Sequence, residues 1–312
     1  MKRAFGLEAI EREDDSFVTV GTFDGVHIGH QAILRYLVKR AAAGDGQSVV
    51  VSFDPHPRTV LGEGAVPLLT TIEERANILK SLGVDRFIVL PFTREFAALP
   101  PEAFVEQILV DKVGLQEIVI GYDHGFGRGR RGDSALLETL GDRFGFSVDV
   151  IPAQVLEAHV VSSTEIRRLL MSEGDVARAA EMLGRSYELS GTVIHGDARG
   201  KTIGFPTANI QVQHVSKAIP LRGVYAVRAQ VDDEAEMLGG MMNIGIRPTF
   251  EGTERRLEVH LFNTDRDLYD RQLRIEFVER IRDERKFDGI EALKQQLSED
   301  RSRCKRALET LS

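Results

Sequence analysis

The chain of 312 residues has little cysteine, no excess of positive charge and no long apolar run. Its one cysteine, Cys304, excludes an internal disulfide and any zinc or iron–sulfur site built from several cysteines. The net charge of −8 argues against a broad surface for nucleic acid, so we expect no nucleic-acid partner. Acidic residues arrive by Glu8, and no apolar run reaches the length of about 18 residues that a membrane span needs. We therefore expect no signal peptide, no membrane partner and a cytoplasmic location.

The first half of the chain predicts an α/β domain with a parallel sheet. Short apolar runs alternate there with helical patterns, and parallel strands need such crossover helices. The runs are continuous rather than alternating, which is typical of a sheet covered on both faces. Strands are expected at residues 17–20, 48–53, 86–90, 117–121 and 147–151. Helices are expected directly after the first strand and at residues 72–81, 102–110 and 134–142.

The stretch from Val18 to His30, VTVGTFDGVHIGH, marks the first candidate site. An apolar run breaks at Gly21, His27 and His30 follow, and a helical pattern begins at once. Backbone N–H groups in the first turn of a helix favour anions. A structural role for the histidines is one alternative, and a metal site is another, although no third ligand with suitable spacing is visible. For phosphate chemistry the pair would position the ligand and stabilise its charge.

Three more segments of the first half carry polar residues near expected strand or helix ends. SFDPHP follows the second strand, and GYDHGFGRGRRGD follows the fourth. The latter contains G-x-G-x-x-G, but a dinucleotide fingerprint needs that motif after the first strand. A solvated loop and a basic loop over a phosphorylated ligand remain as alternatives. In VSSTEIRR a serine or threonine can cap a helix, while Arg167, one turn in, could equally reach a phosphate.

The second half predicts a small antiparallel barrel or sandwich. Several strands follow one another, at residues 187–194, 223–231, 239–243, 256–262 and 272–280. A helix at residues 176–183 precedes them, so we place the domains at 1–184 and 185–312. A last helix is expected to begin with a capping box formed by Asp288 and Glu291. Its apolar stripe, which we interpret as core packing, comprises Ile290, Leu293, Leu297, Cys304, Leu308 and Leu311.

The segment IHGDARGKTIGFPTANI is the second candidate site. It is not a P-loop, because three residues separate Gly196 from Gly200 where that motif needs four. Thr207 and Asn209 supply neutral oxygens two residues apart, which suit Mg²⁺ shared with nucleotide phosphates, although a plain turn explains the composition equally well. In the alternating strand RLEVHLF, Glu258 is either part of a solvated face or a general base for phosphoryl transfer.

The motifs of the first half resemble a known family. GTFDGVHIGH is similar to the nucleotidyltransferase signature, and VSSTEIR to its matching element. With SFDPHP and GYDHGFGRGRRGD, they resemble the FMN adenylyltransferase module of bifunctional bacterial riboflavin kinase/FAD synthetases, a Rossmann-like domain. The family usually has an aromatic residue at the position of His124. The resemblance implies ATP contacts from Gly21, Thr22, Phe23, Asp24, Gly25, Ser163 and Thr164, charge stabilisation by His27, His30 and Arg167, and flavin contacts from His56, Asp123 and Phe126.

The second half resembles the riboflavin kinase module of the same family. GDARGKTIGFPTANI, NIGIRPTF, LEVHLF and DERKF occur in the family's order and spacing. The resemblance implies a six-stranded antiparallel Greek-key barrel. It implies a Mg²⁺–ATP site at Thr207 and Asn209, with Glu258 as catalytic base and Arg282 near the isoalloxazine ring. The remaining ATP contacts would come from Gly196, Arg199, Gly200 and Lys201.

Together the two resemblances imply an enzyme that phosphorylates riboflavin to FMN and then adenylylates FMN to FAD. ATP and Mg²⁺ would serve both steps, and the partners would be the small molecules riboflavin, FMN and ATP. We expect a monomer or a weak homo-oligomer. The alternatives are an enzyme with only the kinase active and a flavin or nucleotide sensor without catalysis.

Overall fold

The structure is a computed structural model that divides into two compact units, Met1–Ser163 and Thr164–Ser312. It describes residues 1–62, 64–121, 125–127, 129, 132–151, 161–196, 200, 203–249, 252–264 and 266–310, without the side chains of residues 247–249 and 252–254. Within these ranges, no helix combines the length and apolarity needed to cross a bilayer. The helices just before the barrel belong to the second unit, and the functional boundary at residue 184 stays a prediction.

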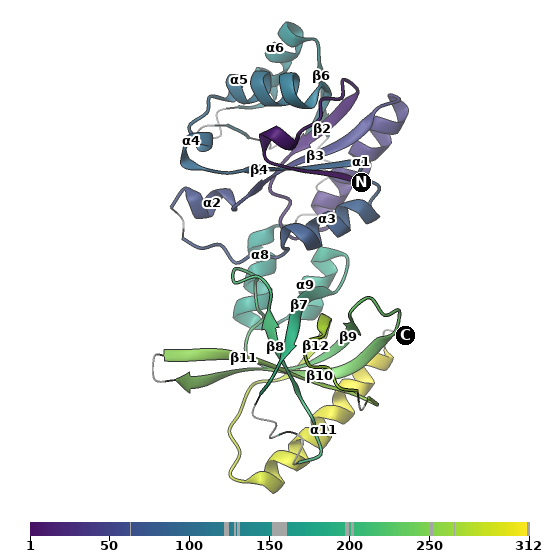
Figure 1. Cartoon of the computed structure of the whole chain (residues 1–312), viewed down its shortest axis with the longest axis vertical. Helices are drawn as coiled ribbons and strands as arrows, with labels where there is room; N and C mark the ends of the chain where they lie inside the picture. The colour runs from purple at the N-terminus through teal and green to yellow at the C-terminus, as the bar shows by residue number, and fades with distance from the viewer. Residues whose placement is uncertain are drawn as a thin grey trace. The chain divides into compact units, whose positions relative to one another are not determined.

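The first unit is a parallel sheet with the strand order β1-β4-β3-β2-β5-β6 (Figure 1). Its strands are β1 (Lys2–Phe5), β2 (Ser16–Val20), β3 (Gln47–Asp54), β4 (Arg86–Pro91), β5 (Leu115–Gly121) and β6 (Ser147–Ile151). Its helical segments are η1 (Leu7–Ala9), α1 (Ile28–Ala43), α2 (Pro57–Val60), α3 (Ile72–Ser81), α4 (Arg94–Ala97), α5 (Pro101–Phe104), η2 (Val105–Val113) and α6 (Ser134–Phe144).

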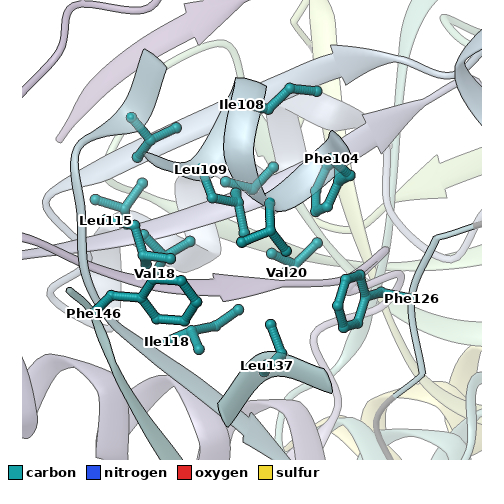
Figure 2. Close-up of a cluster of buried hydrophobic side chains, with 14 of the residues drawn as sticks. Val18, Val20, Phe104, Ile108, Leu109, Leu115, Ile118, Phe126, Leu137 and Phe146 are labelled. Atoms are coloured by element: carbon teal, nitrogen blue, oxygen red, sulfur yellow. The ribbon is translucent and has the colours of Figure 1, made fainter. Parts of the chain in front are cut away.

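Both faces of this sheet are covered, which confirms the expectation from its continuous apolar strands. Val49 and Val51 of β3 face a cluster formed with η2 and α6, whereas Val50 between them faces α1 and α3. Figure 2 shows the first cluster, in which Val18 and Ile118 meet apolar side chains of η2 and α6. Successive side chains of a strand point to opposite faces, so each strand must be apolar throughout. Burying such an aliphatic side chain contributes about 2 kcal/mol.

The strand order reverses next to β2, which places the first candidate site at the switch point of the sheet. From β2 the chain adds β3 and β4 on one side, and β5 and β6 on the other. Ligands of open α/β sheets bind beyond the carboxyl ends of the strands at such a point. The loop between β2 and α1, residues 21–27, begins there. We call it the β2–α1 loop.

The second unit contains a closed antiparallel barrel with the strand order β10-β11-β8-β7-β12-β9. Three helical segments precede it, α8 (Ser163–Arg168, whose first residue belongs to the first unit), η4 (Leu169–Glu173) and α9 (Val176–Leu183). The strands are β7 (Tyr187–Ile194), β8 (Ala208–Val212), β9 (Gly223–Val231), β10 (Met237–Thr249), β11 (Gly252–Leu261) and β12 (Gln272–Arg282). The barrel settles the choice between barrel and sandwich, as the family resemblance implied.

A long helix, α11 (Ile290–Glu309), packs along the barrel against β9, β10 and β12 (Figure 1, yellow). The predicted capping box is wrong, because Gly289 is the N-cap and no side chain caps the helix there. The predicted apolar stripe is partly wrong as well. Ile290 is 61% exposed, and the buried line of the helix runs through Gln296, Asp300 and Cys304. Leu297 and Leu308 pack beside that line.

Candidate active sites

Two stacked imidazole rings lie at the junction of the β2–α1 loop and α1. His27 is the N-cap of the helix, and its Nδ1 accepts a hydrogen bond from the backbone N–H of His30 at 3.3 Å. The ring centroids of His27 and His30 lie 3.6 Å apart with an angle of 18° between the ring planes. Since Nδ1 of His27 accepts, it carries no proton, and the neutral ring places its hydrogen on Nε2.

His30 combines burial with an unsatisfied ring nitrogen. Within the part of the chain that the structure describes, its Nδ1 is buried and has no hydrogen-bond partner. Burial, followed by the charges of His27 and Arg75, lowers the pKa of His30 well below its ordinary value of 6.5. A buried polar atom without a partner is costly, and a ligand that supplies the missing partner removes that cost. A phosphate oxygen is one acceptor that would supply this missing partner.

The shape of the β2–α1 loop depends on a buried carboxylate. Asp24 is 1% exposed and accepts hydrogen bonds from the backbone N–H groups of Leu69 at 3.1 Å and Thr70 at 2.9 Å. Arg75, which is equally buried, lies with Nη2 at 3.7 Å from Oδ1 of Asp24 and donates to Ser52 at 3.0 Å. Asp24 therefore anchors the loop from inside. Its predicted contact with ATP stays a prediction.

Backbone strain marks the same loop. Phe23 and Val26 have φ angles of 46° and 39°, in the left-handed region that residues other than glycine avoid. Gly25 between them has a φ of 83°, and its N–H donates to the hydroxyl of Thr70 at 3.0 Å. Strained turns of this kind persist where surrounding contacts hold them, and they concentrate at ligand sites. Gly21 and Thr22 enter this turn from β2.

The segment that begins α8 reaches the same loop through Ser163. Its hydroxyl donates to the backbone carbonyl of Asp24 at 2.8 Å. The structure thus brings Ser163 together with the β2–α1 loop, far away in the sequence. Thr164 and Arg167 follow on the same helix but belong to the second compact unit. Their contact with ATP stays a prediction.

The predicted flavin contacts of the first unit fall into three groups. His56 is the N-cap of α2, where its Nδ1 accepts from the N–H of Arg58 at 3.2 Å. Phe126 is 8% exposed and packs in the cluster of Figure 2, with its ring centroid 6.2 Å from that of Phe104. Its ring supports the core, and a flavin contact from it stays a prediction. Asp123, like His124, lies outside the described residues.

The second candidate site is built where the chain returns to the barrel at β8. We call residues 196–207 the glycine-rich loop. A Cβ atom at Gly200 would lie 2.2 Å from the carbonyl oxygen of Phe205 and 3.1 Å from Oγ1 of Thr207. A Cβ atom at Gly196 would lie 1.9 Å from Nδ2 of Asn209. At Gly200 the neighbour is backbone, so only glycine allows the approach, whereas at Gly196 a larger residue would displace the Asn209 side chain. Arg199 and Lys201 of the loop lie outside the described residues.

Strand register brings the polar residues of this site together. Glu258 of β11 lies opposite Asn209 of β8 on one side and opposite Asn243 of β10 on the other. Its carboxylate is 3.7 Å from Nη1 of Arg256, and its side chain is 30% accessible. Side chains of directly paired residues lie on the same face of a sheet. Glu258 is therefore a solvent-accessible carboxylate on the same face of the sheet as two asparagine side chains.

A cavity of about 280 Å³ adjoins these residues. Thr207, Glu258, Arg282 and Gly200, all predicted from the sequence, line it. No role at this site was predicted from the sequence for the other lining residues, although NIGIRPTF and DERKF contain three of the polar ones. These other residues are Ile203, Phe205, Val224, Met241, Met242, Asn243, His260, Glu284, Arg285, Phe287, Leu293 and Leu297. A mixed cavity of this kind, largely apolar with a few polar groups, is typical of a small-molecule site.

His260 supports the glycine-rich loop from the barrel. Its Nδ1 lies 2.7 Å from the carbonyl oxygen of Pro206, so Nδ1 carries the hydrogen and donates. Burial lowers the pKa of His260, partly offset by this hydrogen bond, and keeps the ring neutral. The bond holds the residue directly before Thr207.

The donor set around Thr207 and Asn209 suits a hard divalent cation such as Mg²⁺. Hydroxyl, amide and carboxylate oxygens are the ligands that Mg²⁺ prefers, and it shares them with phosphates and water. The two glycines leave the space beside these oxygens unfilled by side chains. Among the described residues, no cluster of three or more His, Cys, Asp or Glu side chains could hold a metal, so a cage made by the protein alone is not found there.

Comparison with known proteins matches the two halves of the chain to two different family models. Residues 9–165 match the family model described as FAD synthetase, and residues 183–308 match the one described as riboflavin kinase. The bifunctional riboflavin kinase/FMN adenylyltransferase of Haemophilus influenzae is 38% identical over 91% of each chain. Its counterpart in Listeria monocytogenes is 39% identical over 91% of this chain and 89% of its own.

A solved structure extends the likeness to the architecture. The crystal structure described as a macrolide-efflux protein from Streptococcus pneumoniae is 30% identical, with a TM-score of 0.85 over 97% of this chain and 98% of its own. The resemblance inferred from the motifs is thus confirmed by independent matches to both halves of the chain. The chain combines an α/β unit, which has a histidine pair at its switch point, with a closed barrel that has a carboxylate beside a cavity. It therefore belongs to the family of bifunctional riboflavin kinases/FMN adenylyltransferases.

Proposed function

We propose that the chain makes FAD from riboflavin in two ATP-dependent reactions, one for each module. The second module moves the γ-phosphoryl group of ATP to the ribityl 5′-hydroxyl of riboflavin and releases ADP. The first joins the resulting FMN to the adenylyl group of a second ATP and releases pyrophosphate. The observation that supports this most directly is the placement of Glu258 opposite Asn209, beside the cavity that Thr207 also lines.

In the kinase reaction, Glu258 takes the proton of the ribityl hydroxyl as its oxygen attacks the γ-phosphorus. Its partial exposure at the cavity gives the carboxylate access to a substrate hydroxyl. A positioned general base of this kind contributes roughly 10²- to 10⁴-fold to the rate. Thr207 and Asn209 orient the phosphates, and the close approach of Gly196 and Gly200 leaves room for them. Arg199 and Lys201 would add positive charge from the same loop.

Mg²⁺ would be held by the side-chain oxygens of Thr207 and Asn209, together with phosphate oxygens. When bound, it supplies neutralisation of the charge that develops on the phosphoryl oxygens. The protein's own contribution is to fix these two donors. His260 does so by holding the Pro206 carbonyl, and Gly200 by its steric fit to Thr207.

In the adenylyl reaction, an oxygen of the FMN phosphate attacks the α-phosphorus, and the bond to the β,γ-pyrophosphate breaks. No protein nucleophile is required. His30 donates its unpartnered Nδ1 hydrogen to a phosphate oxygen, and His27 donates from Nε2 beside it. Because burial lowers the pKa of His30, its ring is neutral in the free protein and stabilises charge as a hydrogen-bond donor rather than as a fixed cation.

The rest of the nucleotide site surrounds the histidines. Gly21, Thr22, Phe23 and Gly25 form the turn against which ATP binds, and Asp24 holds that turn in shape. Ser163 fixes the start of α8 to the loop. Thr164 and Arg167 on that helix hold the leaving pyrophosphate.

The flavin contacts belong to the same proposal. In the first unit, His56 and Asp123 contact the flavin, and Phe126, whose ring also packs in the core, is the third candidate contact. In the second unit, Arg282 contacts the isoalloxazine ring from the wall of the cavity. The flanking Phe287 and Met241 supply the apolar surface that such a ring needs.

One assay tests the proposal. The protein is incubated with riboflavin and Mg·ATP, and FMN and FAD are separated by chromatography. We expect both products. FMN without FAD would leave only the kinase active, and neither product would leave a flavin or nucleotide sensor.

Two substitutions test the division of labour. Glu258→Ala should stop FMN formation and still convert supplied FMN to FAD, whereas His30→Ala should do the reverse. A folded variant in which either change removes both activities would show that the assignment of residues is wrong.

The wider setting belongs to the proposal as well. We infer a cytoplasmic protein, monomeric or weakly homo-oligomeric, whose partners are riboflavin, FMN and ATP. The net charge of −8 supports the inference that no nucleic acid takes part. Light scattering after size-exclusion chromatography measures the oligomeric state, and a stable complex of defined larger size would overturn it.

A further inference from the structure

A carboxylate buried behind the wall of the kinase cavity has no role in the reaction described so far. Asp300 lies in the middle of α11 and is 0% exposed. Arg282 lines the cavity, whereas Asp300 is not among the described residues that line it. Asp300 therefore stands behind Arg282 as seen from the ligand.

The side chains of Arg282 and Asp300 form a bidentate ion pair. Nε of Arg282 donates to both carboxylate oxygens of Asp300 at 3.0 Å, and Nη2 donates to Oδ2 at 2.7 Å. Nη1 of Arg282 donates to the backbone carbonyl of Asp283 at 2.8 Å. Gln296, one turn earlier on α11, donates to Oδ1 of Asp300 at 2.7 Å. Every nitrogen of the guanidinium group thus has a partner that fixes its plane.

This arrangement decides what Arg282 offers to a ligand. The negative charge of Asp300 compensates the guanidinium within hydrogen-bond distance, so the pair presents little net charge to the cavity. The guanidinium group of Arg282 thus offers the ligand a flat, delocalised surface. Its central carbon lies 5.6 Å from the ring centroid of Phe287, so an aromatic ring lies next to it. Planar guanidinium groups stack on conjugated rings.

We propose that Asp300 is a positioning residue that holds Arg282 as a flat, charge-compensated wall for the conjugated ring of the flavin. Arg282 then recognises the ring system of riboflavin and not a phosphate group of ATP. This inference rests on the proposed kinase function of the cavity. It extends that function by naming a residue of α11 that sets flavin affinity without touching the flavin.

The test compares Asp300→Asn with Glu299→Gln. Both changes replace a carboxylate by an amide on α11, but Glu299 is exposed and, within the part of the chain that the structure describes, bonds only to Gln295. We expect Asp300→Asn to raise the KM for riboflavin, and its Kd measured by flavin fluorescence without ATP, about tenfold. The KM for ATP and the conversion of FMN to FAD should stay within about twofold. Glu299→Gln should match the wild type in all four measurements. A selective rise in the KM for ATP would overturn the proposal, because Arg282 would then face the nucleotide.

A double-mutant cycle separates positioning from general support of the fold. In an Arg282→Gln background, Asp300→Asn should add little further change in riboflavin Kd, because its effect passes through the guanidinium. An equal effect in both backgrounds would overturn the proposal. If Asp300→Asn does not fold, Gln296→Met serves in the same cycle. It removes one donor to Asp300 and should raise the riboflavin Kd about threefold only where Arg282 is present.

The outcomes distinguish this inference from the proposed function. A wild-type protein that forms no FMN would end the kinase assignment itself. A wild-type protein that forms FMN, with Asp300→Asn equal to Glu299→Gln in riboflavin affinity, would end only the role given to Asp300.

Discussion

The β2–α1 loop of the first unit and the glycine-rich loop of the second are both proposed to hold the triphosphate of ATP, but they are built differently. The first is held by buried charge, with Asp24 and Arg75 fixing a strained turn. The second is held by close packing, with Gly196 and Gly200 against Asn209 and Thr207. The first site should therefore fail when a charge is removed, and the second when volume is added.

The largest effect is expected from replacing Asp24. Asp24→Ala leaves Arg75 buried without its ion pair, which typically costs about 3–5 kcal/mol. We expect the first unit to unfold at a lower temperature and FAD formation to disappear, while FMN formation stays within about twofold. Calorimetry with both assays measures this. Asp14→Ala, at a carboxylate with an 80% accessible side chain, is the control and should change little. Equal stability of the two variants would contradict the role of Asp24.

Added volume in the second loop should have the next largest effect. The methyl group of Gly200→Ala would meet the Phe205 carbonyl at 2.2 Å, so the backbone before Thr207 must move. We expect FMN formation to fall about a hundredfold, because small misplacements of catalytic groups cost this much. FAD formation from supplied FMN should be unchanged. Gly204→Asn is the control for added volume, since no atom lies within 4 Å of a Cβ there and only backbone strain at its φ of 82° is added. Normal kinase activity in Gly200→Ala would refute the steric argument.

Phe126 tests whether a predicted flavin contact is a core residue. Phe126→Leu should lower the free energy of unfolding of the first unit by about 1.5 kcal/mol, because the ring packs in the core. The KM for FMN should stay within about twofold. A tenfold rise in this KM at unchanged stability would show instead that the ring contacts flavin. Phe5→Leu, at a 56% exposed ring, is the matched control.

The smallest expected effect is a dependence of stability on pH. The pKa of His30 is lowered in the folded state from the ordinary histidine value of 6.5. Below pH 6.5 the unfolded chain therefore binds more protons at His30 than the folded chain does. The stability due to neutral His30 is thus present above pH 6.5 and is lost as the pH falls below it, by at most about 1.4 kcal/mol per pH unit. Denaturant unfolding at pH 7.5 and 5.5 should show a smaller loss for His30→Gln than for the wild type. Identical losses would mean that His30 titrates normally.

Hydrophobic periodicity predicted those helices and strands in which the local pattern of apolar residues determines which face is buried. The helix expected at residues 72–81 and the strand expected at residues 187–194 have the predicted bounds in α3 and β7. It missed β1, a charged edge strand, and β8, which follows a glycine- and proline-rich loop. In both, pairing with a distant strand rather than local pattern determines the conformation.

The sites show the same limit. Motif residues such as Thr207 and Glu258 were found, and the structure places both at one cavity. Arg75 and Asp300 were not found, because a charged residue in a helix predicts a solvated face unless its partner is known. Their partners, Asp24 and Arg282, come from other parts of the chain. A charged residue is buried only together with its ion-pair partner, and the local sequence around one residue does not identify that partner.

Closure of the barrel also determines which strand edges of the chain are exposed for pairing with a strand of another chain. All six barrel strands, within the described residues, pair on both sides, so none of them offers a free edge to another chain. The sheet of the first unit ends in β1 and β6 instead. Lys2 and Arg3 place charge on one edge, and Asp149, paired with Arg40, places it on the other. We therefore expect neutralising these edge charges to promote aggregation, whereas changes of surface charge on the barrel should not.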